Sequence, residues 1–278
     1  MSTVLETIDG GTRYLEKRGV ADARRNMQML VAHQLNCTRM DLYLQFDRPL
    51  DDNDLAPLRD ALRRRGEGVP LQHLLGTVDF HRREFATDAR ALIPRPETEE
   101  LVERVLALPL PAAPAVLDMG TGSGVLGLTL AADLPGAHAT LADLSPDALA
   151  LAAENAQRLG LTNVTLVHSD LFANLPGEYD LIVANLPYVA ERERAGLAAE
   201  VRHDPEMALF SGADGLDLIR RFIPDAFARL RPGGWLAMEI GYDQAAAVAR
   251  LLESAGFREI EVFLDLSKIA RFPIARKP

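Results

Sequence analysis

From residue 115 onward, short apolar runs alternate regularly with helix-like stretches. Alternation of this kind is typical of α/β folds in which helices cover a largely parallel sheet. Strands are expected at residues 115–118, 139–143, 164–167, 179–185, 235–240, 260–263 and 269–275. The sequence therefore predicts a doubly wound, Rossmann-like α/β domain.

The preceding part of the chain has helical spacing of Leu, Val, Met and Ala, with no strand-like alternation. Helices are expected at residues 2–18, 22–34, 38–46 and 51–65. The basic end of the last helix, Arg63 to Arg65, is expected to be solvated. These segments predict a small helical N-terminal domain.

Alternating residues at 78–80 and 83–87 predict a β-hairpin between the two domains. Pro94 and Pro96 then fix the approach of the chain into a helix that starts near Glu97. We therefore divide the chain into a helical domain at 1–74, a hairpin linker at 75–96 and an α/β domain at 97–278.

The composition limits the compartment and the classes of partner. A net charge of -10 disfavours nonspecific binding to nucleic acid, because phosphates are held mainly by Lys and Arg. Cys37 is the single cysteine, and the six histidines lack ligand-like spacing, so no metal is expected. No apolar run approaches the roughly 18 residues of a membrane span. We expect a cytoplasmic monomer that binds neither membranes nor nucleic acid directly.

The apolar run from Leu181 to Ala184 predicts a buried parallel strand, and it is followed by an amide side chain, a proline and an aromatic ring. In open α/β sheets, ligands bind beyond the carboxyl ends of the strands. Asn185, Leu186, Pro187 and Tyr188 are therefore expected to form one wall of a pocket. The strand at 115–118 is followed by a glycine-rich loop, which is expected to form the other wall.

This glycine-rich loop begins at Asp118 and is expected to border a cofactor. Its last part also satisfies the dinucleotide fingerprint, but that match alone is weak. Glycines let the backbone approach a ligand, and an acidic strand end suits a cationic or hydroxyl-bearing ligand better than a pyrophosphate. S-adenosylmethionine has this character. The expected loop contacts are Gly120, Thr121, Gly122, Ser123 and Gly124.

Two further aspartates follow the next predicted strands. Asp143 lies where a carboxylate would accept hydrogen bonds from ribose hydroxyls. Asp170 could meet the adenine amino group, with Leu171 packed against the ring. Each aspartate alone is as easily explained as an N-cap or a solvated turn. With Asp118, however, they mark three successive strand ends, which favours a nucleoside cofactor.

The segment from Asn185 to Tyr188 indicates the reaction. An amide nitrogen is a poor nucleophile because its lone pair is delocalised. Acceptors against its N–H groups would stabilise the developing charge and orient the lone pair. The Asn185 side-chain oxygen and the Leu186 carbonyl can be those acceptors, while Tyr188 offers a face for the planar substrate group. Direct methyl transfer needs neither a metal nor a covalent intermediate.

These motifs together resemble the release factor glutamine methyltransferases over nearly the whole chain. The resemblance rests on Asn185-Leu-Pro-Tyr188, the glycine-rich loop, the helical N-terminal domain and Ile93-Pro-Arg-Pro-Glu-Thr-Glu99. It implies methyl transfer from S-adenosylmethionine to the glutamine side chain in the Gly-Gly-Gln motif of peptide chain release factors. It also implies that Asn185 borders the cofactor and that Leu171 takes a place that is often aromatic.

Leu186 departs from the family pattern, which has proline there. The acceptor at that position is a backbone carbonyl, which any residue provides, so we expect activity to persist. Three alternatives remain open: a ribosomal-protein glutamine methyltransferase, a nucleic-acid methyltransferase acting on the adenine amino group, and a binding module without turnover.

Overall fold

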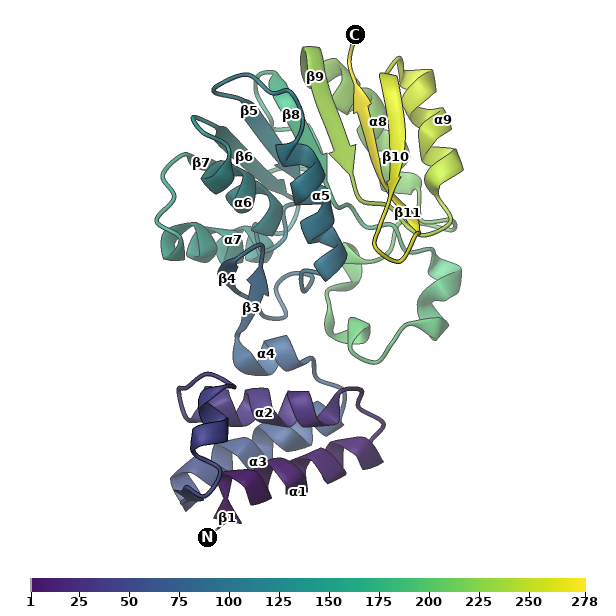
Figure 1. Ribbon diagram of the computed structural model, residues 1–278. Helices are drawn as coiled ribbons and strands as arrows, with labels where there is room; N and C mark the ends of the chain where they lie inside the picture. The colour runs from purple at the N-terminus through teal and green to yellow at the C-terminus, as the bar shows by residue number, and fades with distance from the viewer. Residues whose placement is uncertain (1) are drawn as a thin grey trace. The chain divides into compact units, whose positions relative to one another are not determined.

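Residues 2–278 are described by the computed structural model and separate into two units (Figure 1). One unit contains the chain up to Thr77 together with Ala198–His203. The other contains Val78–Leu197 and Asp204–Pro278. Across the described residues, no helix is both long and apolar enough to cross a membrane.

The N-terminal unit is built from three main helices around an apolar core. Reciprocal side-chain and backbone hydrogen bonds between Thr3 and Glu6 start the first helix, and Asp51 and Asp54 start the third in the same way. Val4, Ile8 and Val31 are among its fully buried core residues. The elements are β1 (Ser2–Thr3), α1 (Val4–Lys17), α2 (Ala23–Gln34), η1 (Asp41–Leu44), β2 (Pro49–Leu50), α3 (Asp52–Gly66) and α4 (Leu71–Leu75).

The helix predicted at 38–46 is wrong, because only a short 3₁₀ helix forms at Asp41–Leu44. Thr38 and Asp41 do exchange cap-like hydrogen bonds, with the two backbone nitrogens 2.9 and 3.2 Å from the side-chain oxygens. The chain then turns so that Pro49–Leu50 pairs with Ser2–Thr3, two strands that the sequence did not indicate. This early turn leaves no length for further α-helical turns.

Arg65 is buried, although the basic end of α3 was predicted to be solvated. Its Nε donates to Asn26 Oδ1 at 2.7 Å and its Nη1 donates to the Val69 carbonyl at 3.1 Å. It also pairs with Glu200, which ties residues 198–203 to this unit. Arg63, in contrast, stays half exposed in ion pairs with Asp60 of its own helix and with Glu67 directly after the helix.

The second unit is organised around a seven-stranded sheet in the order β10-β11-β9-β8-β5-β6-β7. The pairs from β9 to β7 are parallel, while β11 is antiparallel to both of its neighbours. All seven predicted strands are confirmed: β9 begins five residues before its predicted start at 235, and the other strand ends shift by one or two residues at most. They are β5 (Ala115–Met119), β6 (His138–Asp143), β7 (Val164–His168), β8 (Tyr179–Ala184), β9 (Leu230–Met238), β10 (Arg258–Leu264) and β11 (Ala270–Arg276).

Helices cover both faces of this sheet (Figure 1). One buried core joins the sheet to α5 (Pro96–Leu106), α6 (Val125–Asp133) and α7 (Pro146–Arg158). The opposite core includes α8 (Asp217–Arg229) and α9 (Ala245–Ala255). The predicted hairpin is confirmed as β3 (Thr77–Phe80) and β4 (Arg83–Ala86), with Phe80 and Phe85 buried in the first core.

The order of the strands places the two predicted pocket walls side by side. From β5 the chain proceeds through β6 and β7 in one direction, and then crosses to β8 and β9 on the other side. Met119 pairs with Ala184, so the loops after β5 and β8 begin next to each other. A ligand crevice is expected at such a change of direction. Three 3₁₀ helices follow β8: η2 (Glu191–Gly196), η3 (Val201–His203) and η4 (Glu206–Ala208).

Candidate functional site

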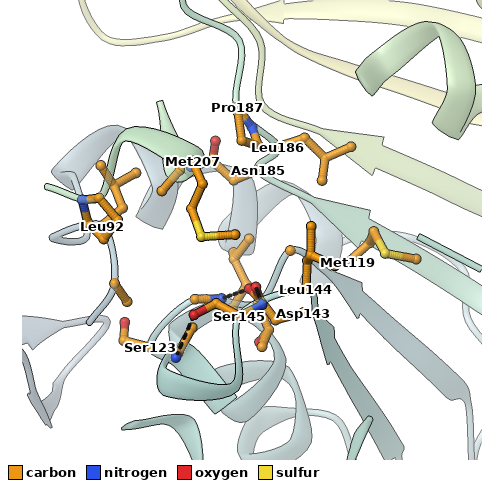
Figure 2. Close-up of a pocket in the computed structure, with 18 of the residues that line it drawn as sticks. Leu92, Met119, Ser123, Asp143, Leu144, Ser145, Asn185, Leu186, Pro187 and Met207 are labelled. Carbon is orange, nitrogen blue, oxygen red and sulfur yellow. Dashed lines mark hydrogen bonds between the residues drawn. The ribbon is translucent and has the colours of Figure 1, made fainter. Parts of the chain in front are cut away.

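A pocket lies beyond the carboxyl ends of β5, β6, β7 and β8 (Figure 2). Further parts of its wall come from residues 90–98 and from the loop at 205–208. The structure brings most of the predicted site residues into this one lining. They are Gly120, Thr121, Gly122, Ser123, Asp143, Asp170, Leu171, Asn185, Leu186 and Pro187.

Glycine is required at two tight positions of the loop after β5. Gly124 has φ of 88°, and a Cβ there would lie 2.8 Å from Leu128 Cδ1, so it shapes the start of α6 without lining the pocket. Gly120 has φ of 69°, and a Cβ there would lie 2.9 Å from Leu186 Cδ2. The loop after β5 therefore packs directly against the residue that follows Asn185.

The backbone amides of this loop are largely engaged within the protein. Gly120 and Thr121 donate to the Ala142 carbonyl at 2.8 and 3.0 Å, and Gly124 donates to the Thr121 carbonyl at 2.8 Å. Gly122 donates to Asp143 Oδ2 at 2.9 Å. A pyrophosphate site needs free amides pointing at the ligand. The loop therefore does not fit the dinucleotide interpretation of its glycines.

Asp118 does not face the pocket, which corrects the expectation that its carboxylate would meet the ligand. It is 1% exposed, and its Oδ2 accepts from Thr121 Oγ1 at 2.6 Å and from the Gly127 amide at 2.8 Å. Burial raises its pKa from the ordinary 3.8 to about 6, against the lowering effect of these two hydrogen bonds. Asp118 thus holds the loop in place from the protein interior.

Asp143 does line the pocket, and it also shapes the surrounding backbone. Its two carboxylate oxygens accept from the Gly122 amide at 2.9 Å and from the Ser145 amide at 2.8 Å. Each oxygen keeps a further lone pair for a ligand hydroxyl. Leu144, the next residue, is half exposed at the same wall. The sequence interpretation missed Leu144, although its place directly after a strand-end aspartate was a usable signal.

The loop after β7 contributes Asp170 and Leu171. The Asp170 carboxylate is exposed and pairs with Arg221 at 3.0 Å. Leu171 is buried and adopts φ of 47°, a left-handed conformation that is uncommon for a leucine. Ser169 Oγ donates to the Leu171 carbonyl at 2.6 Å and holds this conformation. A strained residue at a pocket wall is typical of a ligand-binding position.

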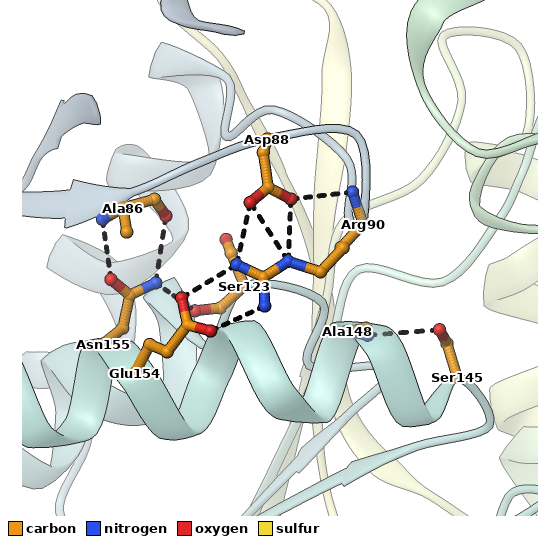
Figure 3. Close-up of polar contacts among 8 residues, drawn as sticks. All are labelled: Ala86, Asp88, Arg90, Ser123, Ser145, Ala148, Glu154 and Asn155. Carbon is orange, nitrogen blue, oxygen red and sulfur yellow. Dashed lines mark hydrogen bonds and ion pairs between the residues drawn. The ribbon is translucent and has the colours of Figure 1, made fainter. Parts of the chain in front are cut away.

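Side chains of helix α7 contact the glycine loop and the pocket wall (Figure 3). Buried Asn155 donates to the Ser123 carbonyl at 2.8 Å and accepts from the Ala86 amide at 2.7 Å. Arg90, at the pocket wall, is held by Asp88 and by Glu154 at 2.7 Å. The contacts of Asn155 and Glu154 join segments far apart in the sequence, so no local pattern could have predicted them.

A second arginine at the wall, Arg95, is paired with Asp204 at 2.8 Å. The Asp204 side chain is fully buried and also accepts from the Ile93 amide at 3.2 Å. This contact holds the start of the loop that brings half-exposed Met207 to the pocket. Both arginines at the pocket wall are thus neutralised by carboxylates. The pocket offers little attraction for a phosphate.

Asn185, Leu186 and Pro187 form the wall at the end of β8, whereas Tyr188 is not part of the lining. The Tyr188 hydroxyl donates to Glu239 Oε1 at 3.1 Å. Burial raises the pKa of Tyr188, so the hydroxyl keeps its proton. The Asn185 amide nitrogen lies 3.4 Å from Thr98 Oγ1.

Within residues 2–278, no cluster of three or more His, Cys, Asp or Glu side chains has the arrangement needed to hold a metal ion. The polar groups of the pocket are instead single carboxylates, amides and backbone groups from separate strand ends. Such a lining can bind hydroxyl, ammonium and amide groups.

Two protein families match the chain, each over a different part. The PrmC N-terminal domain matches residues 6–76, and the methyltransferase small domain matches residues 98–268. A release factor glutamine methyltransferase from Deinococcus radiodurans is 42% identical over 273 residues, which cover 98% of both chains. Another from Cereibacter sphaeroides is 43% identical over 266 residues, which cover 95% of both chains.

A solved structure shares the fold of the α/β unit. It is a 16S rRNA methyltransferase from T. thermophilus in complex with AdoMet and guanosine, with a TM-score of 0.51 and 22% sequence identity. The match covers 73% of this chain and 50% of that protein. At this level of identity the likeness concerns the fold alone.

Proposed function

This chain belongs to the family of release factor glutamine methyltransferases, and we propose that it methylates the side-chain amide nitrogen of a release factor glutamine. The methyl donor is S-adenosylmethionine, and the other product is S-adenosylhomocysteine. The target is the glutamine of the Gly-Gly-Gln motif in peptide chain release factors. The chain is thus an enzyme of translation termination.

One observation carries this proposal: the glycine loop after β5 and the Asn185 amide open into the same pocket from adjacent strands. A methyl donor and an acceptor amide must meet within a few ångströms. Gly120 packs closely against Leu186, so the loop after β5 and the segment after β8 meet at this point, which supports the proposal.

The residues of the pocket fit S-adenosylmethionine. Asp143 has free lone pairs for ribose hydroxyls, and Leu171 and Leu144 offer apolar surface for an adenine ring. Four of the loop amides and both wall arginines are already engaged, which disfavours a phosphate-bearing cofactor. When bound, S-adenosylmethionine supplies a methyl group on a positively charged sulfur.

We propose that Asn185 and Leu186 activate the substrate glutamine. The Asn185 side-chain oxygen and the Leu186 carbonyl would accept hydrogen bonds from the two N–H groups of the substrate amide. Nitrogen gains positive charge as it attacks, and these acceptors stabilise that charge and orient the lone pair. Pro187 restricts Leu186 to extended dihedrals and so holds its carbonyl in place. Afterwards the nitrogen can lose its proton to water.

Several parts of the proposal concern partners. We propose that the helical N-terminal domain, assigned to 1–74, recognises the body of the release factor, and that the enzyme acts as a monomer without binding nucleic acid. Deletion of residues 1–70 should then raise the KM for release factor and leave cofactor affinity unchanged. Size-exclusion chromatography with light scattering tests whether the enzyme is a monomer. Retention of the enzyme on heparin at moderate salt would contradict the proposal that it does not bind nucleic acid.

The substrate class is tested by transfer of labelled methyl groups. Purified enzyme is supplied separately with release factor, release factor changed to Gly-Gly-Ala, a ribosomal-protein mixture and duplex DNA. We expect label on wild-type release factor alone. Label on ribosomal protein or DNA, but not on release factor, would overturn the assignment in favour of the corresponding methyltransferase class.

A further inference from the structure

A buried carboxylate, Glu239, lies directly behind the Asn185 edge of the pocket. It follows the last residue of β9, is 2% exposed and does not line the pocket. Its Oε2 accepts from Thr98 Oγ1 at 2.7 Å, and its Oε1 accepts from the Tyr188 hydroxyl at 3.1 Å. Neither the strand pattern nor the methylation chemistry described above assigns a role to this group.

The direction of these hydrogen bonds decides what Thr98 can offer to Asn185. The Thr98 hydroxyl has a single proton, and it donates that proton to Glu239 Oε2. Thr98 Oγ1 can therefore offer only a lone pair to Asn185, 3.4 Å away. The atom of Asn185 that faces Thr98 must then be its amino group. The amide is planar, so its oxygen points to the opposite side.

This orientation matters because the two ends of an Asn side chain are nearly identical in shape. In one orientation Asn185 presents an acceptor to the substrate, and in the other it presents two N–H donors. Donors would repel the N–H groups of a substrate amide. The Asn185 side chain would therefore need to be held in one orientation before the substrate binds.

Glu239 also holds Tyr188, at the other end of the segment from Asn185 to Tyr188. Tyr188 and Asn185 are three residues apart, and both are connected to Glu239, one directly and one through Thr98. Burial raises the pKa of Glu239 above its ordinary value, against the lowering effect of the two hydrogen bonds and of the positive charge of Arg271 on β11. Thr98 is itself 2% exposed and lies in the first turn of α5.

We propose that Glu239 and Thr98 are positioning residues that fix the Asn185 amide with its oxygen available to the substrate. This inference deepens the proposed function and rests on it for the identity of the substrate. It also gives a physical role to the threonine of the Pro-Arg-Pro-Glu-Thr-Glu segment. Neither residue contacts the reacting atoms, and each acts through Asn185.

The test compares Thr98→Val, Thr98→Ser and Thr129→Val in the full-length enzyme. Valine keeps the shape of threonine but cannot accept a hydrogen bond, whereas serine keeps the hydroxyl. Thr129 is the matched control, since its hydroxyl is buried in α6 and has no hydrogen-bond partner among the described residues. We expect Thr98→Val to lower kcat about 10-fold to 100-fold, less than loss of a direct transition-state contact. The KM for release factor should change little, and Thr98→Ser should restore most of the turnover.

A second readout does not need substrate. The side-chain amide resonances of Asn185, identified by their loss in Asn185→Ala, are followed in ¹⁵N-labelled enzyme. They should shift in Thr98→Val and in Glu239→Gln, and should stay near the wild-type positions in Thr98→Ser and Thr129→Val. A glutamine at 239 can accept from only one of its two hydroxyl partners, so it disturbs the same network.

The outcomes separate this inference from the proposed function. Turnover by the wild-type enzyme, with a roughly tenfold fall in kcat and shifted Asn185 signals in Thr98→Val, would support both. Wild-type turnover on release factor with unchanged kcat and unchanged Asn185 signals in Thr98→Val would overturn the positioning role alone. Absence of turnover in the wild-type enzyme, with shifted Asn185 signals in Thr98→Val, would overturn the proposed function and leave the network intact.

Discussion

The two sides of the pocket are built in different ways. On the proposed cofactor side, the loop after β5 is held mainly by groups close to it in sequence or on the adjacent strand, such as Asp118, Thr121 and Asp143. On the proposed substrate side, Asn185 is held through Thr98 and Glu239, which lie 87 and 54 residues away along the chain. We infer that binding of the cofactor and activation of the substrate can be disturbed separately.

The largest effect is expected from Asn185→Ala. Removal of one preorganised contact to developing charge lowers turnover by about 10² to 10³. Steady-state kinetics with release factor measure kcat, and Asn185→Asp serves as a control for side-chain shape. Near-normal turnover in the alanine variant would remove Asn185 from the proposed mechanism.

On the cofactor side, Asp143→Ala should weaken cofactor binding more than it affects chemistry. A hydrogen bond to a charged group contributes about 1.5–3 kcal/mol, so the dissociation constant should rise about 10-fold to 100-fold. Calorimetry with S-adenosylhomocysteine measures this constant directly. Asp143 also accepts from Gly122 and Ser145, so Asp143→Asn separates charge from loop support. Unchanged affinity in both variants would contradict the assignment.

Asp118 should make the stability of the enzyme depend on pH. Its folded-state pKa is about 6 against an ordinary 3.8, so between these values the folded protein holds a proton that the unfolded chain has lost. Stability therefore falls as pH rises through this window, by about 1 to 3 kcal/mol for this group. Urea unfolding at pH 4.5 and pH 7, compared with Asp118→Asn, isolates the effect. An equal pH dependence in the two proteins would rule it out.

The smallest effect is expected from Leu186→Pro, which restores the family pattern. The acceptor there is the backbone carbonyl, so turnover should stay within about fivefold of wild type, consistent with the roughly 0.4–1 kcal/mol scale of proline substitutions. A change much larger than this would show that the Leu186 side chain, which packs against Gly120, matters to the site.

The sequence predicted the pocket lining after β5 and β6 better than it predicted the contacts that hold Asn185. Gly120, Gly122 and Asp143 stand out because backbone conformation and strand ends leave local patterns, and all three line the pocket. Asp118 also stood out, yet a local pattern could not tell that its carboxylate points beneath the loop.

The substrate side depends on contacts that only the fold creates. Glu239 follows an apolar strand and could equally have been a solvated strand end. Its role emerges only when α5 brings Thr98 against it. The prediction of a helix at 38–46 failed for a related reason, because pairing of Pro49–Leu50 with the N-terminus overrode local helix propensity.

The most direct test of the central claim is to locate the methyl group itself. Release factor is incubated with enzyme and S-adenosylmethionine, digested, and analysed by tandem mass spectrometry, beside a parallel reaction with Asn185→Ala. We predict one added methyl group on the glutamine side chain of the Gly-Gly-Gln peptide, formed far more slowly by the variant. A methyl group on any other residue, or equal rates for the two enzymes, would contradict the account.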